Sequence, residues 1–190
     1  MPARFLGKAK DGQFQVFQFE NIKNYEVIVL YLNRPKGKGP LLLRINSSCI
    51  TSDVFGDVGR CDCKIQLDNA MDLMAKSDNG MIIYSMNEEG MGNGIFNKIN
   101  SYHLMENENL SSRQAYEKMG FTADNRDYFY VCTILKYYSI NDVILLTNNP
   151  KKMKALTKNN IRVQKRPLVT KSRKLKNYLI SKVLDFGHDI

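Results

Sequence analysis

The N-terminal part of the chain alternates short apolar runs with polar turns. The three clearest runs are FQVFQF at 14–19, YEVIVLYL at 25–32 and PLLLRINS at 40–47. Their length and their content of β-branched, aromatic and leucine residues are typical of strands, and the PKGKGP stretch at 35–40 has the composition of a turn. We therefore expect an antiparallel β-meander over residues 12–47.

Beyond Cys63 the apolar positions recur at three and four residues, which is the spacing of an amphipathic helix. The first such helix runs to about Lys76 and ends at an SDNG turn. The pattern then predicts strands at 80–85, 142–147 and 161–164, a glycine-rich turn at 87–94, and helices at about 95–107, 111–120, 126–138, 150–158 and 172–186. Ser111 or Ser112 is a candidate cap for the second of these helices. We expect one mixed α/β (α+β) domain over residues 1–190, in which the β-meander precedes alternating helices and strands.

The composition fits a compact domain and excludes several classes of protein. With 190 residues, 43% hydrophobic and 25% charged, the chain can bury one real core and is neither disordered nor long enough for two full domains. The longest apolar runs are far too short to span a membrane, and the N-terminus has no apolar stretch of signal-peptide length. We expect a cytoplasmic protein without a membrane partner.

The positive charge is concentrated near the C-terminus. The net charge is +9, yet residues 147–182 contain twelve basic and no acidic residues. Such a stretch indicates an anionic partner, either a phosphorylated metabolite or nucleic acid, unless it is simply a solvated basic surface. Tyr178 is the one aromatic residue in the stretch, so bases would lack stacking platforms. A nucleic-acid-binding module is therefore the weaker alternative.

Three of the four cysteines lie close together in the sequence. Cys49, Cys61 and Cys63 form a C-x11-C-x-C pattern, and disulfides are rare in a reducing compartment. Zinc prefers thiolates, and three protein ligands leave the fourth position to water, as in catalytic sites. Zinc lowers the pKa of bound water and so supplies hydroxide for attack on an electrophilic carbon. The alternative is three ordinary buried cysteines, which the polar sequence RCDCK disfavours.

The remaining cysteine and the two histidines give weaker signals. Cys132 lies in the apolar run YFYVCTIL and is expected in the core. His103 and His188 have no sequence position that suits a fourth metal ligand, and both could equally be surface residues.

Several stretches occur together in a specific order. They are the cysteine loop with RCDC and Gln66, NKINSY at 97–102, GFTADNRD at 120–127, LLTNNPKKMKAL at 145–156, and a tail with NYL at 177–179, Lys182 and GH at 187–188. Over about residues 10–188 the chain resembles the GTP cyclohydrolase II family. The resemblance implies a zinc-dependent hydrolase of cyclic amidine C–N bonds that opens the imidazole ring of GTP. It would release formate and pyrophosphate and leave a diaminopyrimidine ribosylamino phosphate, the first step of riboflavin biosynthesis.

The resemblance also implies roles for individual residues. Cys49, Cys61 and Cys63 would bind one zinc ion, and Tyr102 would be a polar catalytic group near the ring. Arg126 would act at the α-phosphate with Asp124 as its proton acceptor; because a guanidinium is ordinarily a cation, a phosphate clamp oriented by Asp124 is the alternative. Family contacts to the nucleotide fall at Arg44, Ser47, Gln66, Glu89, Gly90, Ser112, Thr147 and Lys152. Glu89 would accept hydrogen bonds from the guanine N1–H and amino group. The family further suggests a homodimer and Mg²⁺ bound with the triphosphate.

Three positions depart from the family pattern, and all three are expected to touch substrate. Asn46 stands where the family usually has histidine, Ser48 where it has glutamate, and Met91 where it has an arginine that contacts the nucleotide. The cysteine loop and the 85–89 turn are each one residue longer than usual. We therefore expect GTP as substrate, with a paralogue that uses another nucleotide or performs part of the reaction as the alternative. An inactive scaffold is a third possibility.

Overall fold

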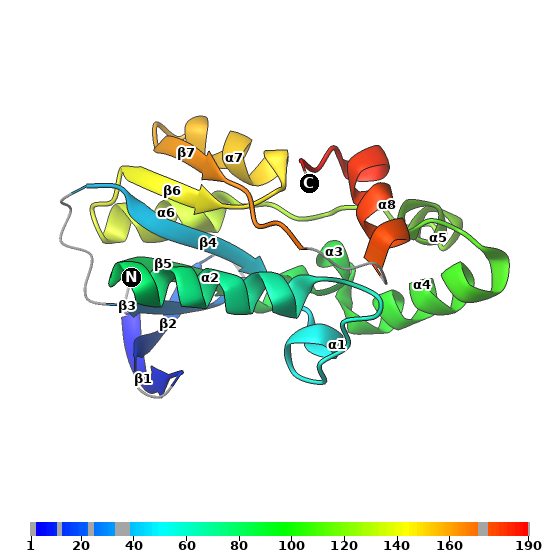
Figure 1. The fold of residues 1–190 in the computed structure, drawn as a ribbon, viewed down its shortest axis with the longest axis horizontal. Helices are drawn as coiled ribbons and strands as arrows, with labels where there is room; N and C mark the ends of the chain where they lie inside the picture. The colour runs from blue at the N-terminus through cyan, green and yellow to red at the C-terminus, as the bar shows by residue number, and fades with distance from the viewer. Residues whose placement is uncertain (1–2, 11–12, 23–24, 33–38, 171–174, 190) are drawn as a thin grey trace.

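The structure, a computed structural model, describes residues 3–10, 13–22, 25–32, 39–170 and 175–189 (Figure 1). Within these residues the strands form a single mixed sheet of order β1-β2-β3-β5-β4-β6-β7. The strands are β1 (Ala3–Ala9), β2 (Phe14–Ile22), β3 (Tyr25–Leu32), β4 (Leu41–Ser47), β5 (Gly80–Ser85), β6 (Asp142–Leu146) and β7 (Arg162–Arg166). The predicted class, a mixed α/β domain, is confirmed.

The predicted meander is correct for two of its three strands. β1, β2, β3 and β5 pair antiparallel in turn, whereas β4 pairs parallel with both β5 and β6. The prediction that residues 41–47 continue the antiparallel meander is therefore wrong. The first six residues of β4 are all buried, as expected for a central parallel strand that is covered on both faces.

The N-terminal strand β1 was not predicted from the pattern. It is an edge strand with exposed side chains at Phe5 and Leu6, and its register with β2 shifts between Phe5 and Gly7. A short, charged and irregular edge strand has little periodic signal, because only one of its sides is paired.

The helices agree with the longer periodic segments. They are α1 (Ile50–Asp53), α2 (Cys63–Ser77), α3 (Glu89–Gly92), α4 (Gly94–Glu108), α5 (Ser112–Lys118), α6 (Phe129–Tyr137), α7 (Pro150–Thr157) and α8 (Lys176–Phe186), with a 3₁₀ turn η1 (Met86–Glu88). Ser111, not Ser112, caps α5 in a reciprocal capping box with Gln114. α6 begins three residues later than predicted, where the carboxylate of Asp127 accepts from the backbone N–H of Phe129 at 3.1 Å. The part of the last helix predicted at 172–174 lies outside the described residues.

The sheet separates two hydrophobic clusters. Leu41, Leu43 and Ile45 of β4 face the larger cluster, whereas Leu42 faces the other, as the two-residue period of a strand requires. α2 packs on one face of the sheet and α6 and α7 on the opposite face (Figure 1). α4, α5 and α8 lie beyond the end of the sheet (Figure 1). In the described part of the chain we find no helix with the length and apolar character of a membrane span.

Candidate active site

The main cavity lies where the parallel strands β4, β5 and β6 end. The carboxyl ends of parallel strands meet at one edge of a sheet, where α/β proteins commonly bind ligands. The cavity has an empty volume of about 1080 Å³, and its walls come from residues 44–49, 60–66, 88–91, 98–105, 112–126, 147–152 and 178–188. Helix α8 contributes Tyr178, Leu179 and Lys182 to its wall. Segments from seven separate parts of the chain therefore meet around one space.

The three clustered cysteines lie together at one end of this cavity. Their Sγ atoms are all within 4.8 Å of one another, and those of Cys49 and Cys61 are 3.6 Å apart. Hydrogen bonds from Cys61 and Cys63, and then the charge of Lys98, lower the pKa of the Cys49 thiol. Cys49 lies two residues after the end of β4 and Cys63 begins α2, so sheet and helix together fix the spacing. The three thiols could hold a metal ion, as the sequence pattern predicted.

A buried ion pair contacts this cysteine cluster. Lys98 of α4 lies 2.6 Å from Oε1 of Glu89 and donates to Sγ of Cys49 at 3.0 Å. Oε2 of Glu89 accepts from the backbone N–H of Ile50 at 2.7 Å, and Oε1 also accepts from that of Gly90 at 3.1 Å. Both oxygens of Glu89 therefore have partners, and Glu89 is not among the residues that line the cavity. Lys98 lies in the NKINSY motif, but the residues alone gave it no role.

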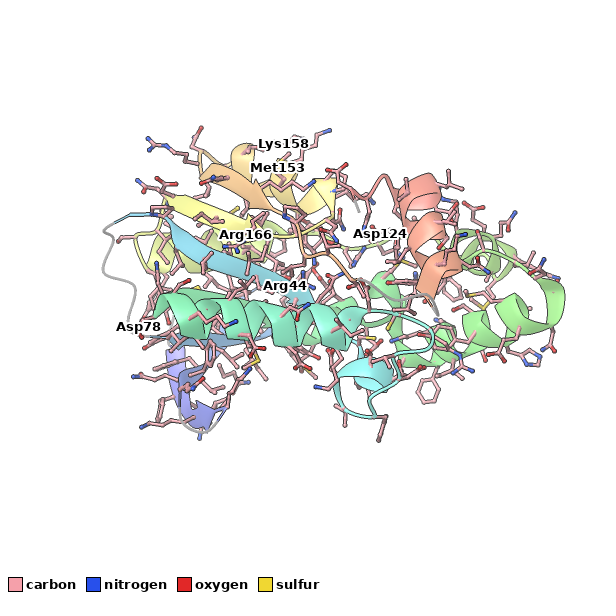
Figure 2. The ribbon with its side chains drawn as sticks, viewed as in Figure 1. Arg44, Asp78, Asp124, Met153, Lys158 and Arg166 are labelled. Carbon is pink, nitrogen blue, oxygen red and sulfur yellow. The ribbon has the colours of Figure 1, made fainter. Side chains whose placement is uncertain are left out.

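The second cluster of charges is built around Arg126. Its Nε and Nη2 atoms donate to the two oxygens of Asp124 at 2.8 and 3.1 Å, and Nη1 donates to Oγ of Ser47 at 3.3 Å. Burial acts to raise the pKa of Asp124, but Arg126 and Lys151 outweigh it and hold that pKa well below its usual range. Arg126 lines the cavity, whereas Asp124, labelled in Figure 2, does not. The carboxylate therefore orients the guanidinium toward the space.

Two further buried cations flank this pair. Arg44 of β4 donates to the carbonyl oxygen of Leu146 at 3.1 Å and to Oδ1 of Asn46 at 3.2 Å. Lys152 of α7 donates to the carbonyl oxygen of Ile45 at 2.8 Å. Burial, more than any other cause, lowers the pKa of Lys152 to about 7. A buried ammonium with a single carbonyl partner in the described structure gains much from an added anion.

Tyr102 of α4 lies at the cysteine end. Its ring lies 5.4 Å from the guanidinium carbon of Arg60 and 5.9 Å from Nζ of Lys98, measured to the ring centroid. Burial is the main cause that raises the pKa of its hydroxyl. The phenol is therefore neutral at physiological pH and lies within the same wall as the three thiols.

The turn between β5 and α4 carries a strained backbone. Gly90 and Met91 both have φ of 58° and ψ of 35°, in the left-handed region that methionine seldom adopts. The side chain of Met91 lines the cavity, and Nζ of Lys182 in α8 lies 3.7 Å from its sulfur. Glu88 also lines the cavity and accepts hydrogen bonds from the hydroxyls of Ser47 and Tyr130. Glu88 was not predicted, although it is the nearer carboxylate to the space.

The remaining predicted contacts also lie in the cavity wall. Ser48 donates to the carbonyl oxygen of Met86 at 3.1 Å, Gln66 donates to Asp62 at 2.6 Å, and the hydroxyl of Thr147 accepts from the backbone N–H of Asn149 at 3.1 Å. The predicted residues that line the cavity are Arg44, Asn46, Ser47, Ser48, Cys49, Cys61, Cys63, Gln66, Gly90, Met91, Tyr102, Ser112, Arg126, Thr147 and Lys152. The two that do not, Glu89 and Asp124, each hold a cation that does.

The C-terminal segment supplies wall residues to which the sequence assigned no role. Tyr178, Leu179 and Lys182 of α8 line the cavity, and so does His188 just after it. The sequence left open whether His188 is a surface residue; in the structure it is partly buried and lines this wall. The NYL and GH matches lie in this segment and were the available signal.

Comparison with known proteins identifies the family of the chain. A family model described as GTP cyclohydrolase II matches residues 5–167. A protein named GTP cyclohydrolase-2 from Picrophilus torridus is 35% identical over 190 residues, which cover 99% of this chain and 94% of that protein. A GTP cyclohydrolase-2 from Campylobacter hominis is 37% identical and covers 99% of this chain and 91% of its own length. A protein named Riboflavin biosynthesis protein RibBA from Bacillus cytotoxicus is 38% identical over 93% of this chain, which matches 45% of that protein.

The cavity thus combines a thiol cluster that could hold a metal ion with oriented, buried cations that suit an anionic ligand. The chain belongs to the GTP cyclohydrolase II family.

Proposed function

We propose that the protein hydrolyses GTP, opening the imidazole ring and releasing formate and pyrophosphate, as the first step of riboflavin biosynthesis. The observation that carries the proposal is that a three-thiol cluster and Arg126, which is held by Asp124, line the wall of one cavity. The names of the relatives, GTP cyclohydrolase-2 among them, support the same substrate.

Zinc is the proposed metal, held by Cys49, Cys61 and Cys63. Thiolates bound at about 2.3 Å to a tetrahedral zinc ion lie about 3.8 Å apart, close to the 3.6 Å between Sγ of Cys49 and Sγ of Cys61. When bound, the ion would activate water for attack on an electrophilic carbon. The ammonium of Lys98, 3.0 Å from Sγ of Cys49, offsets part of the charge of three thiolates.

We propose that Tyr102 contacts the purine ring and its departing groups. The phenol lies in the same wall as the thiols, and its raised pKa keeps it protonated, so it can donate a hydrogen bond to a nitrogen or oxygen of the ring. Burial beside Lys98 and Arg60 keeps the hydroxyl away from bulk water.

Arg126 is proposed as a clamp for the α-phosphate rather than a nucleophile. Two hydrogen bonds to Asp124 stabilise the charged guanidinium, and a cation has no free electron pair on nitrogen for attack at phosphorus. Asp124 then orients Arg126, and Lys152 and Thr147 contribute further donors at this end. Arg44, Gln66 and Ser112 complete the contacts proposed for the nucleotide.

The identity of the base depends on the turn at 88–91. We propose that the carboxylate of Glu89 reaches the base only if ligand binding breaks its ion pair with Lys98. Glu88, which already lines the cavity, is the alternative hydrogen-bond acceptor for the base. With Met91, Asn46 and Ser48 in place of charged or ionisable groups, a related nucleotide is the second candidate substrate. Methionine and the small polar side chains place fewer cationic donors around the base.

The proposal includes the surroundings of the reaction. Mg²⁺ would accompany the triphosphate, as it does in most nucleotide sites. Reduced thiols favour the cytoplasm. A homodimer is supported by large exposed side chains such as Phe55 and Phe96, 78% and 84% exposed.

The test is to incubate the zinc-loaded protein with GTP, ATP, ITP and XTP and to follow formate, pyrophosphate and the purine absorbance. We expect formate and pyrophosphate from GTP. Cys61→Ser should lose both zinc and formate release, whereas Cys132→Ser, outside the cavity wall, should retain both. Formate from none of the nucleotides would overturn the proposal, and formate from another nucleotide alone would favour the second candidate.

A further inference from the structure

His188 lies at a turn that directs its ring into the cavity wall. α8 ends at Gly187, whose φ of 65° lets the chain reverse, and the backbone N–H of His188 then donates to the carbonyl oxygen of Lys182 at 3.1 Å. The next residue, Asp189, donates its backbone N–H to the carbonyl oxygen of Asn148 at 3.1 Å and pairs with Lys165. The segment is thus anchored to α8 through the backbone of His188, and through Asp189 to Asn148 just after β6 and to Lys165 of β7.

The Nε2 atom of His188 is buried and has no hydrogen-bond partner among the described residues. A buried polar atom without a partner costs free energy, so such atoms usually have a ligand or water to meet. The ring lines the same cavity as Arg126, Lys152 and Lys182. The unpartnered nitrogen therefore lies in the wall of a space rich in cations.

The charged groups around His188 are unbalanced. Lys182 of α8, Lys152 of α7 and Arg126 are cations; Asp124 is already paired with Arg126, and Asp189 with Lys165. Burial first, and then Lys182, lower the pKa of His188 to about 3. The imidazole is therefore neutral in the free protein, and a polyanion in this space would reverse the electrostatic penalty on its protonated form.

We propose that His188 binds the polyphosphate end of the substrate and takes up a proton when that anion enters. The inference rests on the proposed function for the polyphosphate, and it adds a residue and a protonation step at that end. The charge of the anion offsets Arg126, Lys152 and Lys182, so the imidazolium becomes favourable and Nε2–H donates to a phosphate oxygen. Above the pKa of the bound histidine, affinity then falls as the pH rises.

The test uses inorganic triphosphate and the zinc-loaded full-length protein with ¹⁵N-labelled histidine. The chain has two histidines, so His188→Gln and His103→Gln assign the ring signals by NMR. On addition of triphosphate at pH 6.5, the His188 ring nitrogens should shift to the imidazolium form, whereas those of exposed His103 should not change. His188→Gln should weaken triphosphate binding about tenfold, as loss of one hydrogen bond to a charged group predicts, and His103→Gln should leave it unchanged.

Three results would overturn the inference. Triphosphate could fail to bind the wild-type protein, it could saturate the protein without changing the His188 ring signals, or it could bind His188→Gln as tightly as the wild type. If His188→Gln fails to fold, the wild-type titration decides alone. Triphosphate carries no purine, so imidazolium formation without formate release from GTP would reject the proposed function and keep this inference. Formate release with an unchanged histidine would do the reverse.

Discussion

Lys98 shows how a single buried side chain can connect the metal ligands to the rest of the fold. Its ammonium is 2.6 Å from Glu89 and 3.0 Å from Cys49, and its side chain is 9% exposed. A hydrogen bond to a ligand atom orients the ligand and tunes its charge, and such partners typically change metal affinity about 10- to 100-fold. We therefore regard Lys98 as a positioning residue for Cys49.

Replacing Lys98 with methionine should weaken zinc binding about tenfold or more in competition with a chelator. The change also leaves Glu89 as an unpaired buried carboxylate, which should lower the free energy of unfolding by about 3 kcal/mol. Lys98→Met/Glu89→Gln removes both charges and should recover much of the stability without recovering zinc affinity. Lys64→Met, which alters an exposed lysine beside Cys63, is the control. Wild-type zinc affinity in the double variant would exclude the positioning role.

The lowered pKa of Lys152 predicts how the stability of the protein depends on pH. Its pKa is about 7 in the folded protein and 10.5 as the ordinary value, so between these values the unfolded chain binds more protons. Stability from this group must therefore rise as the pH rises from 7 toward 10.5. Urea unfolding of Lys152→Met should show a shallower rise over this range than the wild type. Lys154→Met, on the exposed side of the same helix, is the control and should follow the wild type. If the free energy of unfolding rises equally with pH in all three proteins, burial does not lower the pKa of Lys152.

At the scale of elements, the closest packing found at any described glycine is that between α2 and β5. A Cβ on Gly80, at the start of β5, would lie 2.2 Å from Cγ of Met74 in α2. Helix α2 carries Cys63 at its start, so its position on the sheet also positions the thiol cluster.

Gly80→Ala should lower the free energy of unfolding by about 1–3 kcal/mol through overpacking, measured by denaturant unfolding. Gly59→Ala is the matched control, because a Cβ there meets only the side chain of Asp57 at 3.5 Å. A neutral Gly80→Ala would mean that Met74 can move aside, and α2 would then be a less rigid support than we infer.

Elements with a strong period could be predicted from the sequence, and elements fixed by distant partners could not. The helices at α2, α4 and α7 follow from apolar spacing and caps. The place of β4 does not, because pairing parallel to β5 and β6 depends on strands that come later in the chain. The four-residue helices α1 and α3 lie in polar turns, where no period can develop.

The site residues also divide into those that local motifs predict and those whose roles depend on distant partners. The thiol cluster and the Arg126–Asp124 pair could be predicted from local motifs. The roles of Lys98, Glu88 and His188 could not, because each depends on a partner from another element: Cys49, Ser47 and the cations of α7 and α8 respectively.

At the scale of the whole molecule, the basic C-terminal stretch divides into two sets. Lys152 and Lys182 line the cavity, whereas Lys151, Lys154, Lys158, Arg162, Arg166 and Lys176 are exposed. Lys165 belongs to neither set, because it is partly buried and pairs with Asp189. Lys171, Arg173 and Lys174 lie outside the described residues. The exposed set creates a positive field around a cavity that we propose takes a triphosphate.

Because exposed charges are screened by salt, kcat/KM for GTP should fall severalfold as KCl is raised from about 50 to about 300 mM, with a smaller change in kcat. Steady-state kinetics over this range measures it. If kcat/KM does not depend on salt, the exposed charges have no role in substrate capture. Tight, salt-dependent binding of RNA without nucleotide turnover would instead favour the nucleic-acid-binding alternative.

The most direct measurement of the central claim follows one carbon atom. Zinc-loaded protein is incubated with GTP labelled with ¹³C at C8, and formate is detected by ¹³C NMR while pyrophosphate is assayed in the same sample. The account predicts labelled formate and pyrophosphate in equal amounts, and neither from Cys61→Ser. Label that stays in an intact purine ring, with the protein folded and zinc bound, would contradict it.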